Sequence, residues 1–488
     1  MRSCEARWLV SITLLLLCGA VTAQERTVPV STVEGLQQAL EAAQPGDVIE
    51  VADGTYSLSG NLTVTRSGTE ENPIVIRAKH RGRAEITGKG EVLLKGVAYV
   101  AMKGFTFTHC ARYRGWPWGN VTLQDCHHVR FTRNALRLNE DRSMADKKGL
   151  QQWVCITGRK SHHNCIDHNL FDRKTMRGDF ITVTGDDYGG ECCSQHDRID
   201  RNHFRDYKHG GGQNMLETIR AGSNDDGAND VSAFLTIEEN LFERCSGEVE
   251  MISLKCSDNR VLRNTIVDCH GSVCLRLSNR SVVAGNSFIQ TDKADPKLRY
   301  GGVRFYGSGH KVHNNTFENL NGSGMCAPLN IMPGSYEQGR PPPKKGVVCT
   351  PAKNCQVVFN TWVNCNALYL GYDSSERPLP PRGCTFANNI IYGGMDTKPL
   401  LKFHAADGIT CSGNILFPKG KAEVGLSTPD PSAFRIVDPG LIRVGGVWRL
   451  RKNTGPGANA AKGPYALPIC HRPLTPKDVG PDAGPPDP

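Results

Sequence analysis

Beyond its first 25 residues the sequence lacks any apolar run that approaches the ~20 residues a helix needs to span a bilayer. Its repeated segments also lack the periodicity of an amphipathic helix, with apolar residues three and four positions apart. With 488 residues, 39% of them hydrophobic, the chain is long enough to bury a core in one elongated domain or in two or three compact ones. We therefore expect a mainly β-structured protein without a membrane span.

The first residues show a different pattern. Arg2 and Arg7 precede an apolar run, and the small residues at 21–23 suit a cleavage site. This arrangement predicts a signal peptide over residues 1–23 and export of the mature chain, either to the periplasm or out of the cell. A lipoprotein signal at Cys18 is the alternative, which the bulky residue before that cysteine disfavours.

The sequence also lacks the spacing of a zinc site. Cys192 and Cys193 are adjacent, and Cys349 and Cys355 have neither a second CxxC pair nor a histidine pair beside them. Of the 19 cysteines, 17 remain after two leave with the signal peptide. In an oxidising compartment most of these are expected to form disulfides, and the odd number leaves at least one thiol.

Neither sign of charge dominates. Lys and Arg number 58 and Asp and Glu 49, a formal net charge of +9, which falls to +8 (56 − 48) without the signal peptide. A basic excess favours binding to polyanions, either acidic polysaccharides or nucleic acid. Over so long a chain, however, the excess is equally compatible with no charged partner.

A short phrase with an asparagine at its turn repeats along the chain, each time after a β-branched strand and before an apolar residue. Successive asparagines are separated by 22 to 45 residues. A unit that cannot bury its apolar face alone must stack on its neighbours. The repeat therefore predicts a right-handed parallel β-helix with stacked asparagines and long loops on one side, whereas a propeller blade needs ~40 residues. The asparagines are Asn134, Asn169, Asn202, Asn240, Asn264, Asn286, Asn315, Asn360, Asn389 and Asn414.

Two further features belong to this architecture. Cys245 and Cys269 each lie five residues after their turn asparagine, which predicts stacking in adjacent coils as a disulfide or as a ladder of thiols. Residues 32–56 read as a short amphipathic helix followed by a strand, suited to capping a solenoid end. We expect the β-helix to occupy residues 24–479 and the Pro- and Gly-rich residues 480–488 to be disordered.

Charged residues gather in the stretch SGEVEMISLKCSDN at 246–259. Glu248 and Glu250 alternate along one predicted strand, so both face outward, where they repel each other unless a cation lies between them. Carboxylate ligands suit a hard ion such as Ca²⁺. The preceding coil adds Asn214 and Glu217 as an amide and a third carboxylate.

Lys255 follows Glu250 by five residues, an offset that strict alternation would turn inward. We therefore predict a turn or bulge between Ser253 and Lys255 that returns the lysine to the outer face. Arg276 lies 21 residues further on, close to one coil, and is expected beside Lys255.

These motifs resemble polysaccharide lyase family 6, which contains alginate lyases and chondroitinase B. The resemblance rests on N-x-x-E-T-I-R from Asn214 to Arg220, on E-x-E followed by Lys255, and on L-R at Arg276, and similar phrases extend over residues 27–482. It implies a calcium-dependent β-elimination on a uronate-containing acidic polysaccharide, with alginate as the first expectation and chondroitin or dermatan sulfate as the alternative. The R-H-G that often follows the arginine in that family is absent here.

The resemblance also implies roles for residues. Asn214, Glu248 and Glu250, with Glu217 adjacent, would hold Ca²⁺ against the uronate carboxylate. Lys255 would remove the C5 proton, and Arg276 would stabilise the resulting charge or assist departure of the O4 group. An ordinary lysine is protonated at neutral pH, so it needs positive charge nearby to act as a base.

Five more residues are predicted to line the polyanion cleft: Lys174, Arg220, Arg304, Tyr306 and His310. The expected partner is the polysaccharide, with no nucleic acid, and the oligomeric state is not predicted. Two other classes of function stay open. One is a non-catalytic adhesin, which would need neither Lys255 nor Arg276. The other is a hydrolase using the carboxylates at 185–190, although the companion motifs G-H-G and R-I-K are missing.

Overall fold

The structure is a computed structural model that describes residues 26–112, 114–144, 149–185, 192–208, 214–223, 230–337, 348–394, 399–426, 430–451 and 472–483. The predicted signal peptide at residues 1–23 and the acidic run at 186–190 lie outside these ranges. No helix in the described ranges is both long enough and apolar enough to cross a membrane.

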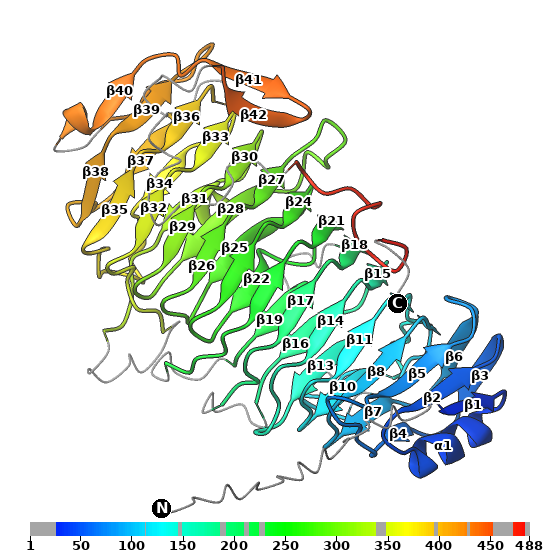
Figure 1. Ribbon diagram of the computed structural model, residues 1–488. Coiled ribbons are helices and arrows are strands. Elements are labelled where there is room, and N and C mark those ends of the chain that lie inside the picture. The colour runs from blue at the N-terminus through cyan, green and yellow to red at the C-terminus, as the bar shows by residue number, and fades with distance from the viewer. Residues whose placement is uncertain are drawn as a thin grey trace, which may run out of the picture.

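The chain winds into a right-handed parallel β-helix with three long sheets, as the asparagine repeat predicts (Figure 1). Each sheet receives about one strand from each coil, and neighbouring strands within a sheet are parallel. One 14-stranded sheet contains β1 (Arg26–Val30), β2 (Asp47–Val51), β5 (Ile74–Ala78), β8 (Val100–Lys103), β11 (Arg130–Thr132), β14 (Cys165–Asp167), β17 (Arg198–Asp200), β20 (Thr236–Glu238), β23 (Arg260–Leu262), β26 (Val282–Ala284), β29 (Lys311–His313), β32 (Gln356–Val358), β35 (Cys384–Ala387) and β38 (Ile409–Ser412).

The second 14-stranded sheet follows it around each coil and contains β3 (Gly54–Leu58), β6 (Ala84–Gly88), β9 (Thr106–Phe107), β12 (Ala135–Leu136), β15 (Leu170–Asp172), β18 (His203–Tyr207), β21 (Leu241–Cys245), β24 (Thr265–Val267), β27 (Ser287–Ile289), β30 (Thr316–Glu318), β33 (Thr361–Val363), β36 (Ile390–Tyr392), β39 (Asn414–Phe417) and β40 (Phe434–Ile436).

The 12-stranded sheet carries the candidate site. It contains β4 (Leu62–Val64), β7 (Val92–Lys95), β10 (Val121–Gln124), β13 (Val154–Thr157), β16 (Ile181–Val183), β19 (Ile219–Ala221), β22 (Glu250–Leu254), β25 (Gly271–Leu275), β28 (Tyr300–Phe305), β31 (Leu329–Ile331), β34 (Leu368–Leu370) and β37 (Leu401–Phe403). A separate antiparallel hairpin, β41 (Leu441–Val444) and β42 (Val447–Leu450), lies at the C-terminal end of the solenoid (Figure 1).

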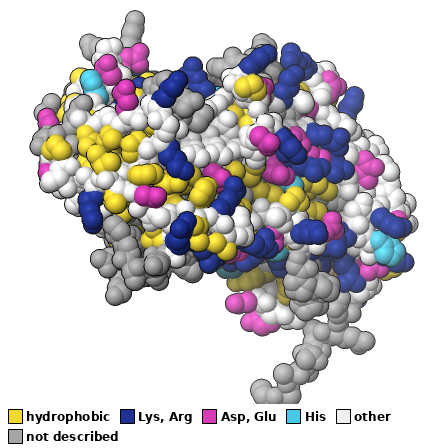
Figure 2. All heavy atoms as spheres, turned by 90° about the horizontal axis from the view of Figure 1, so that it is seen from above, with side chains coloured by type: hydrophobic (Ala, Val, Ile, Leu, Met, Phe, Trp, Pro, Cys, Tyr) yellow, Lys and Arg dark blue, Asp and Glu magenta, His cyan; other side chains and the backbone are white. Residues whose placement is uncertain are grey.

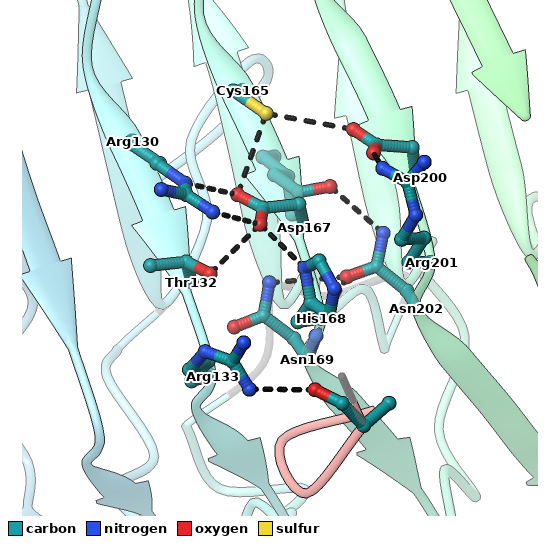
Figure 3. A network of polar contacts seen from close by, with 12 residues as sticks. Arg130, Thr132, Arg133, Cys165, Asp167, His168, Asn169, Asp200, Arg201 and Asn202 are labelled. Carbon is teal, nitrogen blue, oxygen red and sulfur yellow. Dashed lines mark hydrogen bonds and ion pairs between the residues drawn. The ribbon is translucent and has the colours of Figure 1, made fainter. Parts of the chain in front are cut away.

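Ten turn asparagines form one continuous buried ladder, as predicted. After Asn134, the Oδ1 atom of each accepts a hydrogen bond from the backbone N–H of the asparagine one coil earlier, for example 2.9 Å from Asn134 to Asn169. The same contact joins Asn169 to Asn202 at 2.9 Å (Figure 3). Each side-chain amide also donates to a backbone carbonyl, as Asn202 does to Ile166 at 2.8 Å. A buried turn would otherwise leave these backbone groups without partners, so the ladder holds successive coils in register.

The interior of each coil is filled by inward-facing apolar residues that stack from coil to coil. Phe171, Phe204 and Phe242 stack in register, with ring centroids 4.7 and 4.9 Å apart. That spacing equals the distance between neighbouring strands, about 4.8 Å. The parallel pairing therefore determines the packing of the core.

The N-terminal end is capped as predicted. Helix α1 (Val33–Ala42) begins after Thr32, whose Oγ1 accepts from the backbone of Gly35 at 3.0 Å. The helix buries Leu36 and Leu40 against the first coil. Two short 3₁₀ helices, η1 (Gly324–Cys326) and η2 (Pro431–Ala433), complete the helical content of the described residues.

The C-terminal segment packs further along the solenoid than predicted. The expected disorder from residue 480 does not apply to residues 480–483, because Gly480 donates to the carbonyl of Arg201 at 2.9 Å and Arg133 donates to the carbonyl of Ala483 at 2.8 Å (Figure 3). The segment thus crosses several coils of the body (Figure 1).

The prediction that most cysteines form disulfides is wrong for the part of the chain that the structure describes. Cys245 and Cys269 do stack in adjacent coils, but as thiols, with the backbone N–H of Cys245 donating to Sγ of Cys269 at 3.3 Å. Like them, most of the described cysteines are buried. They act as small apolar residues of a core whose stacking already fixes the coils.

The surface carries both signs of charge. Figure 2 shows basic side chains interleaved with acidic ones rather than a uniform basic field on the face it presents. Many of these side chains are paired, as Arg130 is with Asp167 at 2.8 Å (Figure 3). Many surface charges are therefore neutralised locally by a partner of opposite sign.

Candidate active site

Three adjacent coils bring the two predicted catalytic residues and one predicted cleft residue together at one turn. Lys255, Arg276 and Tyr306 each directly follow their strand, respectively β22, β25 and β28. Their backbone N–H groups donate to the preceding coil, from Lys255 to Ala221 at 2.7 Å and from Arg276 to Leu254 at 2.8 Å. Lys255 and Arg276 therefore occupy equivalent positions one coil apart, as predicted.

The predicted irregularity in β22 exists, but its predicted position is wrong. The pairing of β22 with β25 shifts between Glu250 and Ile252, and the consecutive residues Met251 and Ile252 are both buried in the core. Beyond this bulge the strand alternates regularly, so that Ser253 and Lys255 lie on the face opposite to Ile252 and Leu254. The bulge thus turns Glu250, rather than Lys255, toward the outer face.

Three buried carboxyl groups form the acidic side of the site: Asp179, Glu217 and Glu248. Burial alone would raise the pKa of Glu217, but the charges of Lys255 and Arg220 outweigh it and lower that pKa to about 2. Burial, together with the negative charge of Glu217, raises the pKa of Glu248 to about 9 and that of Asp179 to about 8. Without a cation, one ionised and two protonated carboxyl groups therefore share this space at neutral pH.

Backbone and side-chain donors fix two of these groups. The amides of Met215 and Leu216 donate to Oε1 of Glu248 at 3.0 and 3.2 Å, and Thr182 donates to Asp179 at 2.7 Å. Asn214 directly precedes Met215 in the chain and is exposed.

The basic side of the site faces Glu217 and Glu250. Nζ of Lys255 lies 3.3 Å from Oε1 of Glu217, and the Lys255 side chain is only 7% exposed. Glu250 accepts from Arg304 at 2.6 Å and from Ser253 at 2.6 Å, and it forms an ion pair with Nε of Arg276 at 3.2 Å. Burial opposes ionisation of Glu250, but the two arginines lower its pKa below the usual range.

Two predicted cleft residues are not available to a polysaccharide. Lys174 is fully buried, bound to Glu140 and to the carbonyl of Gln151, both at 2.6 Å. His310 is also fully buried, and its Nε2 lies 2.7 Å from the carbonyl oxygen of Tyr306. Burial lowers the pKa of His310 to about 4, so it is neutral at physiological pH. Both predictions are wrong, because each side chain has a structural role inside the molecule.

The other three predicted cleft residues lie at the site but are covered. Arg220 is 2% exposed and stacks under Trp116, with its guanidinium 4.4 Å from the ring centroid. Arg304 is fully buried behind Glu250. Tyr306 lies beneath the guanidinium of Arg276, 5.4 Å from the ring centroid. They position the charged groups in this structure and are not exposed to ligand.

Two functional neighbours were not predicted. Asp179 lies one coil before Glu217, 38 residues earlier, and the same interval separates Asn202 from Asn240 in the ladder, so the coil spacing contained the signal. Cys349 contacts the guanidinium of Arg276 from a long connection between β31 and β32. No pattern in the sequence marks that contact.

The donor set fits a hard cation. Oε2 of Glu217 and Oδ1 of Asp179 are buried and receive no hydrogen bond from a nitrogen or hydroxyl donor among the described residues. Each of these two carboxyl groups lies close to another carboxyl group, with which it interacts electrostatically. Oxygen atoms gathered without enough donors are the environment that Ca²⁺ prefers. Glu217 and Glu248 are thus suited to hold it, with Asp179 behind them. Glu250, a further predicted ligand, is bound in this structure by Arg304, Arg276 and Ser253.

Comparisons with known proteins agree with this geometry. The sequence profile of the family described as chondroitinase B matches residues 30–430. No curated protein matches the sequence. Among solved structures, the alginate lyase AlyGC of polysaccharide lyase family 6 is 25% identical, with a TM-score of 0.73, over 88% of this chain and 56% of its own. This chain therefore spans little more than half the length of that relative.

Two further structures are similar over nearly their whole length. A mannuronic acid-specific family 6 lyase from human gut microbiota is 26% identical, with a TM-score of 0.69, over 85% of this chain and 91% of its own. A family 6 alginate lyase in complex with a trisaccharide is 18% identical, with a TM-score of 0.68, over 94% and 95% respectively. The second likeness supports the fold alone.

Proposed function

Because the chain belongs to the chondroitinase B family, we propose that it is a polysaccharide lyase that cleaves a uronate-containing acidic polysaccharide by calcium-assisted β-elimination. The observation that carries this proposal is one cluster in which Lys255, Arg276 and the carboxyl groups of Glu217, Glu248 and Glu250 meet. A binding protein would need the charges but not a lysine and an arginine in register over paired acids.

The elimination requires one proton to leave C5 while the C4–O4 bond breaks and a C4=C5 double bond forms. Lys255 is the group placed to accept that proton, once its Nζ has left its 3.3 Å contact with Glu217 and has given up its own proton to solvent. Removal of a proton by a positioned base accelerates such steps by about 10² to 10⁴-fold.

Arg276 supports the other end of the reaction. Its guanidinium is held between Glu250 and the ring of Tyr306, which fixes its direction at the coil next to Lys255. A fixed positive charge stabilises negative charge that develops on the uronate, or on the departing O4, without reorganisation.

Bound Ca²⁺ would neutralise the uronate carboxylate, which makes the neighbouring C5 proton more acidic. In this chain Asn214, Glu217, Glu248 and Glu250 would hold the ion. Glu217 is the shared residue, because it contacts Lys255 as well as the two protonated acids. Loss of the protons on Glu248 and Asp179 would accompany metal binding.

Alginate is the substrate that we propose. Of the similar structures described above, AlyGC is an alginate lyase, and the enzyme from human gut microbiota is a family 6 lyase specific for mannuronic acid. The alternative is chondroitin or dermatan sulfate, which the name of the matching family favours. Export through the predicted signal peptide would bring the enzyme to either polymer.

The test is a panel of purified polymers: alginate, polymannuronate, polyguluronate and dermatan sulfate, each with calcium or with a chelator. A lyase leaves an unsaturated uronate that absorbs ultraviolet light, so we expect absorbance to rise on alginate with calcium only. A hydrolase would release reducing ends without absorbance, and an adhesin would bind without releasing either. No absorbance on any polymer would overturn the proposal.

A further inference from the structure

Four histidines form a compact group at another part of the solenoid, on the turns between the 12-stranded sheet and the first 14-stranded sheet. His127 and His128 lie between β10 and β11, and His162 and His163 lie between β13 and β14. Backbone pairing of His127 with His162 stacks the two turns directly. The imidazoles therefore form two stacked columns across the two coils. His127 and His162 form the inner column, and His128 and His163 form the outer column.

The ring geometry brings their nitrogen atoms together. The Nδ1 atoms are 3.0 Å apart in the pair His127 and His128, and 2.9 Å apart in the pair His162 and His163. Between coils, His127 stacks on His162 with ring centroids 4.7 Å apart. One ligand nitrogen from each of His127, His128 and His162 lies within 4.8 Å of the other two.

These separations suit a shared metal ion. Zinc binds imidazole nitrogen at about 2.0–2.1 Å in a tetrahedral arrangement, which places two ligand nitrogens roughly 3.3 Å apart. Small rotations of the rings would bring three nitrogens to that distance. Neutral imidazole suits zinc, copper and nickel, whereas calcium prefers oxygen, so this group and the acidic cluster select different ions.

Ring stacking alone does not explain the histidines. The outer column continues with aromatic residues at the equivalent positions of neighbouring coils. Tyr99 stacks on His128 at one end, and Phe234 stacks on His196 at the other, each pair with ring centroids 4.8 Å apart. Any aromatic residue thus satisfies the stack. The inner column is flanked by Ala98 and Gln195, so stacking does not require a ring there at all.

The imidazoles are also available to a metal. Burial, with the neighbouring histidines, lowers the pKa of His127, His162 and His163 from the ordinary value, which favours the neutral form that binds metal. His162, His163 and His196 line an open pocket of about 480 Å³. The pocket gives an ion and a water ligand access from solvent.

The group is separate from the candidate active site. From His163, the outer column passes through His196 and Phe234 before reaching the coil of Ser257, which follows Lys255. At about 4.8 Å per coil this interval is roughly 14 Å. A metal ion at the histidines would therefore not contact Lys255.

We propose that His127, His128 and His162, with His163 beside them, form a binding site for a divalent transition-metal ion of the zinc, copper or nickel class. The bound ion links two adjacent coils through side chains that otherwise hydrogen-bond within each pair and stack between the coils. Its expected effect is to raise the thermal unfolding midpoint of the protein without replacing calcium at the acidic cluster.

Titration calorimetry with zinc chloride tests the site, on chelator-stripped protein that is then supplied with excess calcium to occupy the acidic cluster. We expect one zinc ion per chain. The double variant His127→Gln/His162→Gln should weaken zinc binding by at least about tenfold. The matched control is His80→Gln/His404→Gln, which removes two histidines from elsewhere and should bind zinc as the wild type does.

A second readout and a second variant keep the outcome decisive. Bound Cu²⁺ should show nitrogen coupling in its electron paramagnetic resonance spectrum in the wild type and lose it in the double variant. If the double variant does not fold, His128→Asn takes its place, because asparagine tolerates the φ of 53° at that position. The proposal is overturned if wild-type protein binds no zinc, or if a folded variant binds it unchanged. Neither result depends on lyase activity.

Discussion

Glu217 is the residue on which the chemistry of the site converges. It is the ion-pair partner of Lys255, and burial together with the charge of Glu217 keeps the neighbouring Glu248 and Asp179 protonated. A cation that binds the acids removes the need for those protons and competes with Lys255 for the same carboxylate. Metal binding, proton release and exposure of the base are therefore coupled through one side chain.

The raised pKa values predict an unusual pH dependence for the calcium-free protein. Glu248, ordinarily near 4.5, is raised to about 9, and Asp179, ordinarily near 3.8, to about 8, so the folded state binds protons there that the unfolded state has lost. Stability should therefore fall as pH rises from about 5 to 8. Thermal unfolding in a chelator at several pH values measures this.

Two controls accompany that measurement. Added calcium should restore stability most at the higher pH, because the ion takes the place of the missing protons. Glu248→Gln, which is neutral at every pH, should flatten the dependence. A thermal midpoint that stays level or rises between pH 5 and 8 without calcium would contradict the assignment.

At this scale the sequence predicted the charged groups of the site but not their exposure. Lys255, Arg276 and the glutamates could be placed because coil spacing puts them in register. Lys174 and His310 were misplaced because their burial depends on how loops fold over the sheet, and Glu140, the partner of Lys174, lies in such a loop outside any repeated phrase. A local sequence pattern does not show whether a loop folds over a side chain and buries it.

Strand β22 is the element that orients the site. Its bulge at Met251 lets Glu250, Ser253 and Lys255 face outward from one short strand. The odd offset between Glu250 and Lys255 revealed that alternation must break. It could not show on which side of Ser253 the break occurs, because both placements satisfy the same spacing.

Gly222, which occupies the position equivalent to Lys255 one coil earlier, provides a test of this element. Gly222 has a φ of +80°, and a Cβ there would lie 2.6 Å from the backbone of Lys255. Gly222→Ala should therefore displace the backbone at Lys255 and lower kcat. This effect comes in addition to the conformational cost of placing alanine at a positive φ. Gly96→Ala, at the equivalent turn after β7 with a φ of +63° and open space around it, carries the conformational cost alone.

Steady-state kinetics on alginate compare the two variants. Equal kcat values for both glycine variants would show that the close approach to Lys255 is irrelevant to activity.

The asparagine ladder is the second element whose loss can be measured. Asn264 accepts from Asn240 at 3.0 Å and donates to Ile237 at 2.9 Å and to Asn286 at 3.0 Å. Asn264→Ala leaves these buried groups without partners and should cost about 3 kcal/mol. Urea unfolding measures the loss. Thr410→Ala, at an exposed position of β38, should change stability by less than about 0.5 kcal/mol.

At the scale of the whole molecule, the fold was predictable because one repeated unit dictates it. The ten asparagines predicted the coils, the sheets and the register of the strands, and the amphipathic pattern of the helix at residues 33–42 predicted the N-terminal cap. The segment near residue 480 was not predictable, because its contacts with Arg133 and Arg201 are made across several hundred residues. The prediction of disulfides failed for a similar reason, because composition does not show which cysteines are buried as thiols in the stacked core.

The most direct test of the central claim is the ultraviolet absorbance of alginate digests made by the wild type and by Lys255→Ala, each with calcium or a chelator. The wild type should produce absorbance only with calcium, and Lys255→Ala should lower the rate by at least about 100-fold with an unchanged unfolding curve. Lys311→Ala, an exposed lysine of β29, is the matched control and should retain full activity. A folded Lys255→Ala protein that cleaves alginate at the wild-type rate would contradict the account.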